Sequence, residues 1–213
     1  MLTLFVTVVA VVAAAGGVIA VASREPRAAT VGLLVALLGS VFVADPLPPP
    51  GALAVRLVAG ILAGYLLWVV VGAARISTSG SVLGWPVEAI LALAGGLVGW
   101  ASHGLGAPGR GPEAASALGV ALVVLSAAPV VLGGRDVLRV GIGLTLLLSG
   151  AFAVRVGLAG TPGPAEQIVL AGLTAGLGAA VAILVRNAVG ARDEGRGAGG
   201  GSHDATGREA VGG

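Results

Sequence analysis

The chain has 213 residues, of which 10% are charged and 56% are hydrophobic, and its formal net charge is +2 at pH 7. A water-soluble domain of this length could not cover its surface with so few charges, so the composition excludes that class. All basic residues are Arg and are scattered along the chain, which argues against nucleic-acid binding, and the absence of Cys excludes disulfides and thiolate metal sites.

Seven apolar runs fill the chain, each of roughly 17–22 residues, the length that an α-helix needs to cross a bilayer. The runs are apolar on all sides, unlike the amphipathic helices of soluble proteins. We therefore predict an all-α polytopic transmembrane helical bundle with about seven spans. Short connections rich in Gly and Pro predict antiparallel neighbours. The predicted spans are Leu2–Ala22, Ala28–Ala44, Leu53–Ala74, Pro86–Ser102, Ala114–Leu132, Val137–Leu158 and Pro164–Asn187.

The placement of Arg predicts the orientation. With the N-terminus outside, nine Arg lie on the cytoplasmic side: Arg24, Arg27, Arg75, Arg135, Arg139, Arg186, Arg192, Arg196 and Arg208. Only Arg56, Arg110 and Arg155 then lie outside, so the positive-inside rule favours an N-out, C-in protein of the plasma membrane. Arg139 and Arg155 are close to opposite ends of the sixth span, where each can extend to its own interface. Residues 190–213 are Gly-rich and charged, which predicts a disordered cytoplasmic tail.

Three pairs of glycines are spaced for close helix packing. Gly60 and Gly64, Gly95 and Gly99, and Gly172 and Gly176 each place two glycines on one helix face, where another backbone can approach. The alternative is chance, because the chain contains 38 Gly.

Glu88 lies just inside the fourth predicted span. An ionisable side chain in a span is a candidate for proton or ion handling. The alternative is a helix cap, because Pro86 is suited to the first helical position and places Glu88 beside the free N–H groups of the first turn. Glu166 follows Pro164 in the same way, and we interpret it as an interfacial cap.

No set of residues predicts enzymatic chemistry. The two His, His103 and His203, are far apart and show no metal-ligand spacing, and there is no phosphate-binding loop or Ser/His/Asp set. We predict no enzymatic activity, no cofactor and no metal. The interiors of the other six spans contain no acid, although a proton pump normally needs such carriers.

The last three spans resemble subunit K of complex I and the C subunit of Mrp-type antiporters. The stretch 117–154 follows that family's pattern of an apolar helix, a short basic turn at Arg135 and Asp136, and a helix with a Gly-Leu element at Gly143 and Leu144. The third helix, which begins with Pro164, has Gln167 and ends at Arg186, is similar as well.

The first three spans resemble, more weakly, subunit J of complex I and its equivalents in antiporters and membrane-bound hydrogenases. The turn Arg24–Ala29 and the Gly-containing run that begins at Leu57 carry this similarity. The resemblances divide the chain into a J-like region of four helices at 1–107, a K-like region of three helices at 108–189 and the tail.

The proton-carrying residues of the K-like family are missing. The resemblance implies a Glu where this chain has Thr145, and a second one near Leu177. It therefore implies a structural, non-catalytic subunit of a complex I, Mrp or hydrogenase-type assembly, in which Thr145, Thr174 and waters contribute at most to a hydrated path. Two alternatives are a self-contained small ion or solute transporter that uses Glu88, and a membrane assembly protein without transport.

Overall fold

A computed structural model describes residues 2–73, 83–102, 111–132 and 136–199, and side chains within these ranges from residue 3 to residue 190. These residues form seven helices and no strand. The helices are α1 (Leu2–Ala22), α2 (Pro26–Val41), α3 (Pro50–Ala73), α4 (Trp85–Ser102), α5 (Glu113–Leu132), α6 (Val137–Ala159) and α7 (Pro164–Gly199). The predicted all-α polytopic bundle is confirmed.

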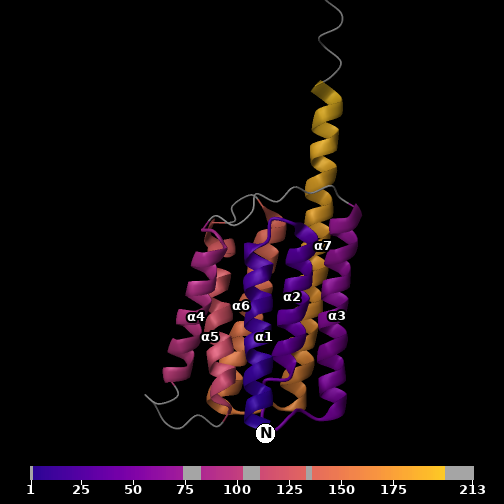
Figure 1. The fold of residues 1–213 in the computed structure, drawn as a ribbon. Coiled ribbons are helices and arrows are strands. Elements are labelled where there is room, and N and C mark those ends of the chain that lie inside the picture. The colour runs from indigo at the N-terminus through magenta and orange to yellow at the C-terminus, as the bar shows by residue number, and fades with distance from the viewer. Residues whose placement is uncertain (1, 74–82, 103–110, 133–135, 200–213) are drawn as a thin grey trace, which may run out of the picture.

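The helices run alternately up and down in a two-layered bundle (Figure 1). In Figure 1, α4, α1, α2 and α3 lie across the front, and α5, α6 and α7 lie behind them. The closest packing joins α5 to α6, α1 to α2, α4 to α5 and α3 to α7. Helices from the predicted J-like and K-like regions therefore pack directly on each other, as α4 does on α5 and α3 does on α7.

Six of the seven helices are long and apolar enough to cross a membrane, and α2 is the exception. The second predicted span, Ala28–Ala44, is wrong at its end, because α2 has 16 residues and stops at Val41. Val43 and Ala44, beyond the helix, are buried in the protein. Irregular backbone is tolerated at membrane depth only in such a protein-enclosed position. The apolar run after α2 therefore continues as irregular backbone enclosed by the protein.

Helix α7 is longer than predicted, because it continues to Gly199 and projects beyond the bundle (Figure 1). Pro is absent from 165–199, and Ala, Arg and Glu favour helix. Of the predicted disordered tail, 190–199 is helical in the structure, whereas 200–213 lies outside the described residues. The start of α1 and the end of α7 lie at opposite ends of the bundle (Figure 1), but the side of the membrane on which each lies stays a prediction.

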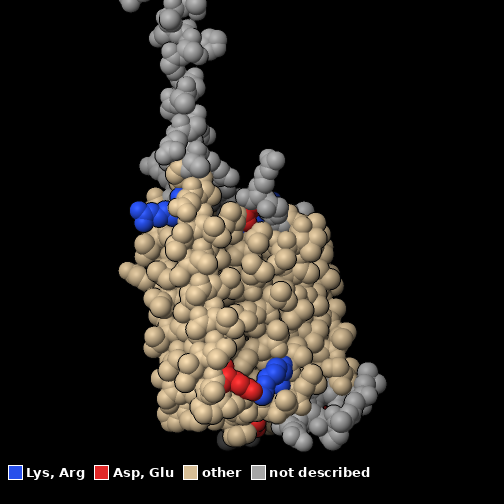
Figure 2. Space-filling view, turned by 180° about the vertical axis from the view of Figure 1, so that it is seen from behind, with Lys and Arg blue, Asp and Glu red and all other residues tan. Residues whose placement is uncertain are grey.

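The charges gather near the ends of the bundle. On the face drawn in Figure 2, a band without Asp, Glu, Lys or Arg separates the charged side chains near the two ends. This band and the apolar helices show an integral membrane protein in contact with lipid. The centre of the bundle is made of large side chains of α5 and α6, among them Leu118, Leu122, Leu125, Ile142 and Leu146.

Candidate functional site

Arg56 is a buried cation inside the bundle. It is the seventh residue of α3, about 9 Å along the helix axis from Pro50. Its side chain is turned inward, so that only 7% of the residue is exposed, and its guanidinium lies 4.4 Å from the centroid of the Phe152 ring on α6. The sequence analysis placed Arg56 at the outer interface, but the side chain lies within the protein.

A small cavity of about 20 Å³ lies beside Arg56, between α2, α3, α6 and α7. Three hydroxyl-bearing residues line it together with Arg56. Thr174 donates to the carbonyl oxygen of Leu170 at 2.9 Å, and Ser40 donates to that of Leu37 at 2.7 Å. Ser149 also lines the cavity, and its hydroxyl makes no hydrogen bond within the described part of the chain. The cavity therefore brings a buried Arg and three hydroxyl-bearing residues together between four helices.

Gln167 extends the polar character of this region along α7. It is 0% exposed, and neither its amide nitrogen nor its amide oxygen has a hydrogen-bond partner among the described residues. Gln167 precedes Leu170, Ala171 and Thr174, which line the cavity, at helical spacings of three, four and seven residues, so it lies on the same helix face. A buried amide without partners is unfavourable by about 1–3 kcal/mol, which makes this position unusual.

The predicted candidates Glu88, Thr145 and Thr174 do not form one site. Glu88 is 2% exposed in the first turn of α4, at the opposite end of the bundle from Arg56 (Figure 1). Thr145 is buried in the middle of α6, where its hydroxyl donates to the carbonyl oxygen of Gly141 at 2.8 Å. Only Thr174 lines the cavity, and its hydroxyl also bonds within its own helix.

Two of the three predicted glycine pairs lie against another helix of the chain. A Cβ atom at Gly64 would be 2.9 Å from Leu34 on α2, and one at Gly60 would contact Leu37 of the same helix. A Cβ atom at Gly95 would be 3.2 Å from the Cα atom of Ala121 on α5.

Gly99 also lies against α5, where an added Cβ would be 2.8 Å from the Cα atom of Ala117. Gly172 and Gly176 differ from these four, because an added Cβ would meet no other atom within 4 Å. This pair lies on the outside of the bundle.

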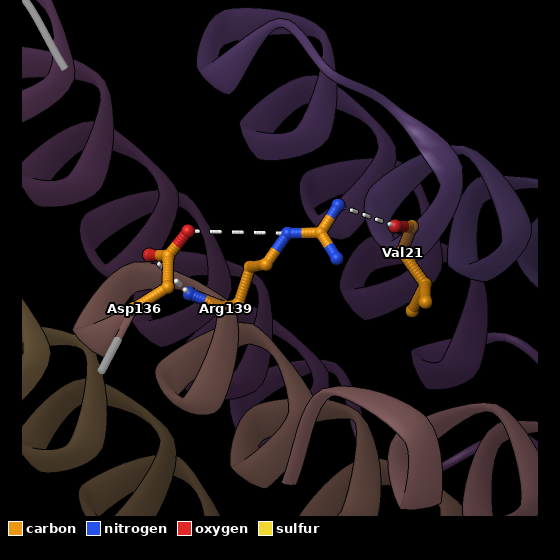
Figure 3. Close-up of polar contacts among 3 residues, drawn as sticks. All are labelled: Val21, Asp136 and Arg139. Atoms are coloured by element: carbon orange, nitrogen blue, oxygen red, sulfur yellow. Dashed lines mark hydrogen bonds and ion pairs between the residues drawn. The ribbon is translucent and has the colours of Figure 1, made fainter. Parts of the chain in front are cut away.

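Arg139 is buried, although the sequence analysis placed it at an interface. It is 8% exposed, and its side chain reaches from α6 to the last turn of α1, where it donates to the carbonyl oxygen of Val21 at 3.5 Å (Figure 3). Its Nε lies 3.9 Å from a carboxylate oxygen of Asp136, which also caps α6 by accepting from the backbone N–H of Arg139. This cluster ties α6 to the carboxyl end of α1, where a cation is favourable.

The other end of α6 carries an ion pair nearer the surface. Arg155 lies 2.7 Å from Glu166 and donates to the carbonyl oxygen of Gly160, where α6 ends. Gly160 has φ of 81°, a conformation that favours glycine. Glu166 thus pairs with Arg155 at the start of α7. His103, Arg110 and Arg135 lie outside the described residues.

Comparison with known proteins gives no family. No protein-family model matches the chain, and neither the curated proteins nor the solved structures contain a match. In the part of the chain that the structure describes, no three His, Cys, Asp or Glu side chains are grouped so that they could hold a metal ion.

Sequence reasoning missed Arg56 and Gln167, although both carry a signal. Arg56 interrupts an apolar helix several residues after its start, and Gln167 repeats the α7 spacing that leads to Thr174. A charged or amide side chain within an apolar helix is expected to face the interior of the bundle and not the lipid.

Proposed function

We propose that the chain is a structural, non-catalytic subunit of a larger membrane assembly of the complex I, Mrp antiporter or membrane-bound hydrogenase type. The observation that carries this proposal is the outward-facing glycine pair on α7. Two glycine pairs pack against other helices of the chain, namely Gly60 with Gly64 and Gly95 with Gly99. Gly172 and Gly176 instead leave open space for the backbone of a helix from another subunit.

The polar groups of the spans support a passive role. Thr145 and Thr174 donate to carbonyl oxygens of their own helices, so neither hydroxyl is a free proton donor for a neighbouring group. A proton path needs carboxylates or similar carriers in succession. Among the described residues of the bundle interior, Glu88 is the one buried carboxylate. Proton transfer therefore belongs to other subunits of the assembly.

Copurification in a mild detergent tests the proposal. We expect the full chain to carry antiporter-like membrane subunits with it, and we expect Gly172→Leu and Gly176→Leu to reduce their yield. Gly72→Leu is the matched control, because Gly72 is also exposed with no atom near an added Cβ, but it lies at the end of α3. A chain that purifies alone contradicts the proposal.

A second candidate function is a self-contained ion or solute transporter, which the burial of Glu88 favours. In proteoliposomes, this function predicts ion flux that the Glu88→Gln exchange lowers at least tenfold, which corresponds to about 1.4 kcal/mol. The absence of flux in the parent protein would remove this candidate.

A further inference from the structure

The unusual feature of the Arg56 region is a buried positive charge with no carboxylate beside it. Arg56 is more than nine-tenths buried, and its charged group contacts the face of Phe152. An aromatic face attracts a cation only weakly compared with a full negative charge. An uncompensated ion in a protein interior is unfavourable by several kcal/mol, so a negative partner is expected at this place.

The part of the chain that the structure describes does not supply that partner. At this end of the bundle the described carboxylates are Asp45, Glu113 and Glu166 (Figure 1). Glu166 pairs with Arg155, and no ion pair joins Asp45 or Glu113 to Arg56. The sequence of 103–110, which connects α4 to α5 and which the structure does not describe, contains no Asp or Glu. No carboxylate of the described residues therefore compensates the charge of Arg56.

The surroundings of Arg56 offer uncharged donors as well. The Ser149 hydroxyl lines the cavity with no hydrogen bond of its own, and the Gln167 amide is fully buried without a partner on the same face of α7. A hydroxyl and an amide N–H both donate to anions. At the cavity itself the donors are the guanidinium of Arg56 and the hydroxyl of Ser149, whereas Gln167 does not line the cavity and lies one helical turn further along α7.

From this donor set we infer that the chain binds one small monovalent anion, of the halide class, at Arg56 between α3, α6 and α7. The cavity of about 20 Å³ exceeds the roughly 10–15 Å³ that one water-sized species requires. A monatomic anion fits this space, whereas a phosphate or a carboxylate-bearing metabolite does not. A water molecule fits as well, but it does not compensate the charge of Arg56.

Thermal unfolding of the purified full chain in detergent tests this inference. We expect the midpoint to rise in a saturable way when sodium chloride or sodium bromide replaces sodium gluconate at constant ionic strength, because a ligand that binds only the folded state stabilises it. Arg56→Gln should abolish the rise. Arg155→Gln is the matched control, since it removes a more exposed Arg of the same end, and it should keep the rise.

Ser149→Ala is a second variant that tests the same anion site if Arg56→Gln does not fold. Loss of one hydrogen bond to a charged group should raise the chloride concentration of half-maximal effect about tenfold. Equal midpoints in chloride and gluconate for the parent chain would overturn the inference and assign a water to the cavity. An unchanged half-effect concentration in Ser149→Ala, or a halide response retained by Arg56→Gln, would also overturn it. The inference is independent of the proposed assembly, because it concerns the isolated chain.

Discussion

The contact between α5 and α6 makes the sharpest stability prediction. A Cβ atom at Gly150 of α6 would lie 2.8 Å from the carbonyl oxygen of Gly119 and 2.9 Å from the backbone nitrogen of Val123, both on α5. Because these are backbone atoms, no side chain can rotate away, and the two helices must move apart. Overpacking of this kind is unfavourable by about 1–3 kcal/mol. Ala is favoured over Gly in a helix by about 1 kcal/mol, so we expect Gly150→Ala to lower the free energy of unfolding by up to about 2 kcal/mol.

Equilibrium unfolding in detergent, followed by far-UV circular dichroism, measures this loss. The matched control is Gly176→Ala, which makes the same chemical change in a helix where an added Cβ meets no atom within 4 Å. We expect the control to leave the free energy of unfolding unchanged or to raise it by up to about 1 kcal/mol. If Gly150→Ala is as stable as Gly176→Ala, the close approach of α5 and α6 is refuted.

Three further substitutions test the polar contacts by the same unfolding assay. Asp136→Ala removes the cap of α6 and the partner of Arg139, and it should lower the free energy of unfolding by about 1–2 kcal/mol; no change would contradict the capping role. Glu166→Gln removes the partly exposed ion pair with Arg155 and should lower the free energy of unfolding by less than about 1 kcal/mol. A larger loss would contradict the position of this ion pair near the surface. Thr145→Val removes a hydroxyl that bonds only within its own helix and should change it by no more than about 1 kcal/mol, whereas a severe loss would indicate an unseen polar partner.

The spans were predictable because a bilayer sets their length and composition. Six predicted spans correspond to helices that are long and apolar enough to cross a membrane. The end of α2 was not predictable in this way, because the residues that follow it, Phe42, Val43 and Ala44, are as apolar as the residues within the helix. The physical signal is Pro46, which disfavours helical backbone at the residue before it and follows the end of α2 closely.

Helix packing was less predictable, because spacing within one helix does not show what lies opposite. The reciprocal contact of Gly16 and Gly32 joins α1 to α2 at 2.8 Å between an added Cβ at Gly16 and the carbonyl oxygen of Gly32. Gly39 of α2 also lies against α1, at Ala13, but it is seven residues from Gly32, so a search for glycines four residues apart finds none of these contacts. Gly172 and Gly176 match that search and nevertheless lie in open space.

The candidate site was only partly predictable for a related reason. Thr174 was identified, but Arg56 was assigned to an interface because Arg near a helix end usually extends to water. Its inward direction depends on Phe152, which lies on a different helix nearly 100 residues later in the chain. Such a contact is a property of the assembled bundle and not of one apolar run.

The mass of the native particle tests the central proposal most directly. Native mass spectrometry of particles released gently from the source membrane measures whether other subunits accompany this 20.3 kDa chain. We predict a mass that includes antiporter-like membrane subunits in addition to the chain. A particle of 20.3 kDa, or of whole multiples of that mass, would contradict the proposed structural role in a larger assembly.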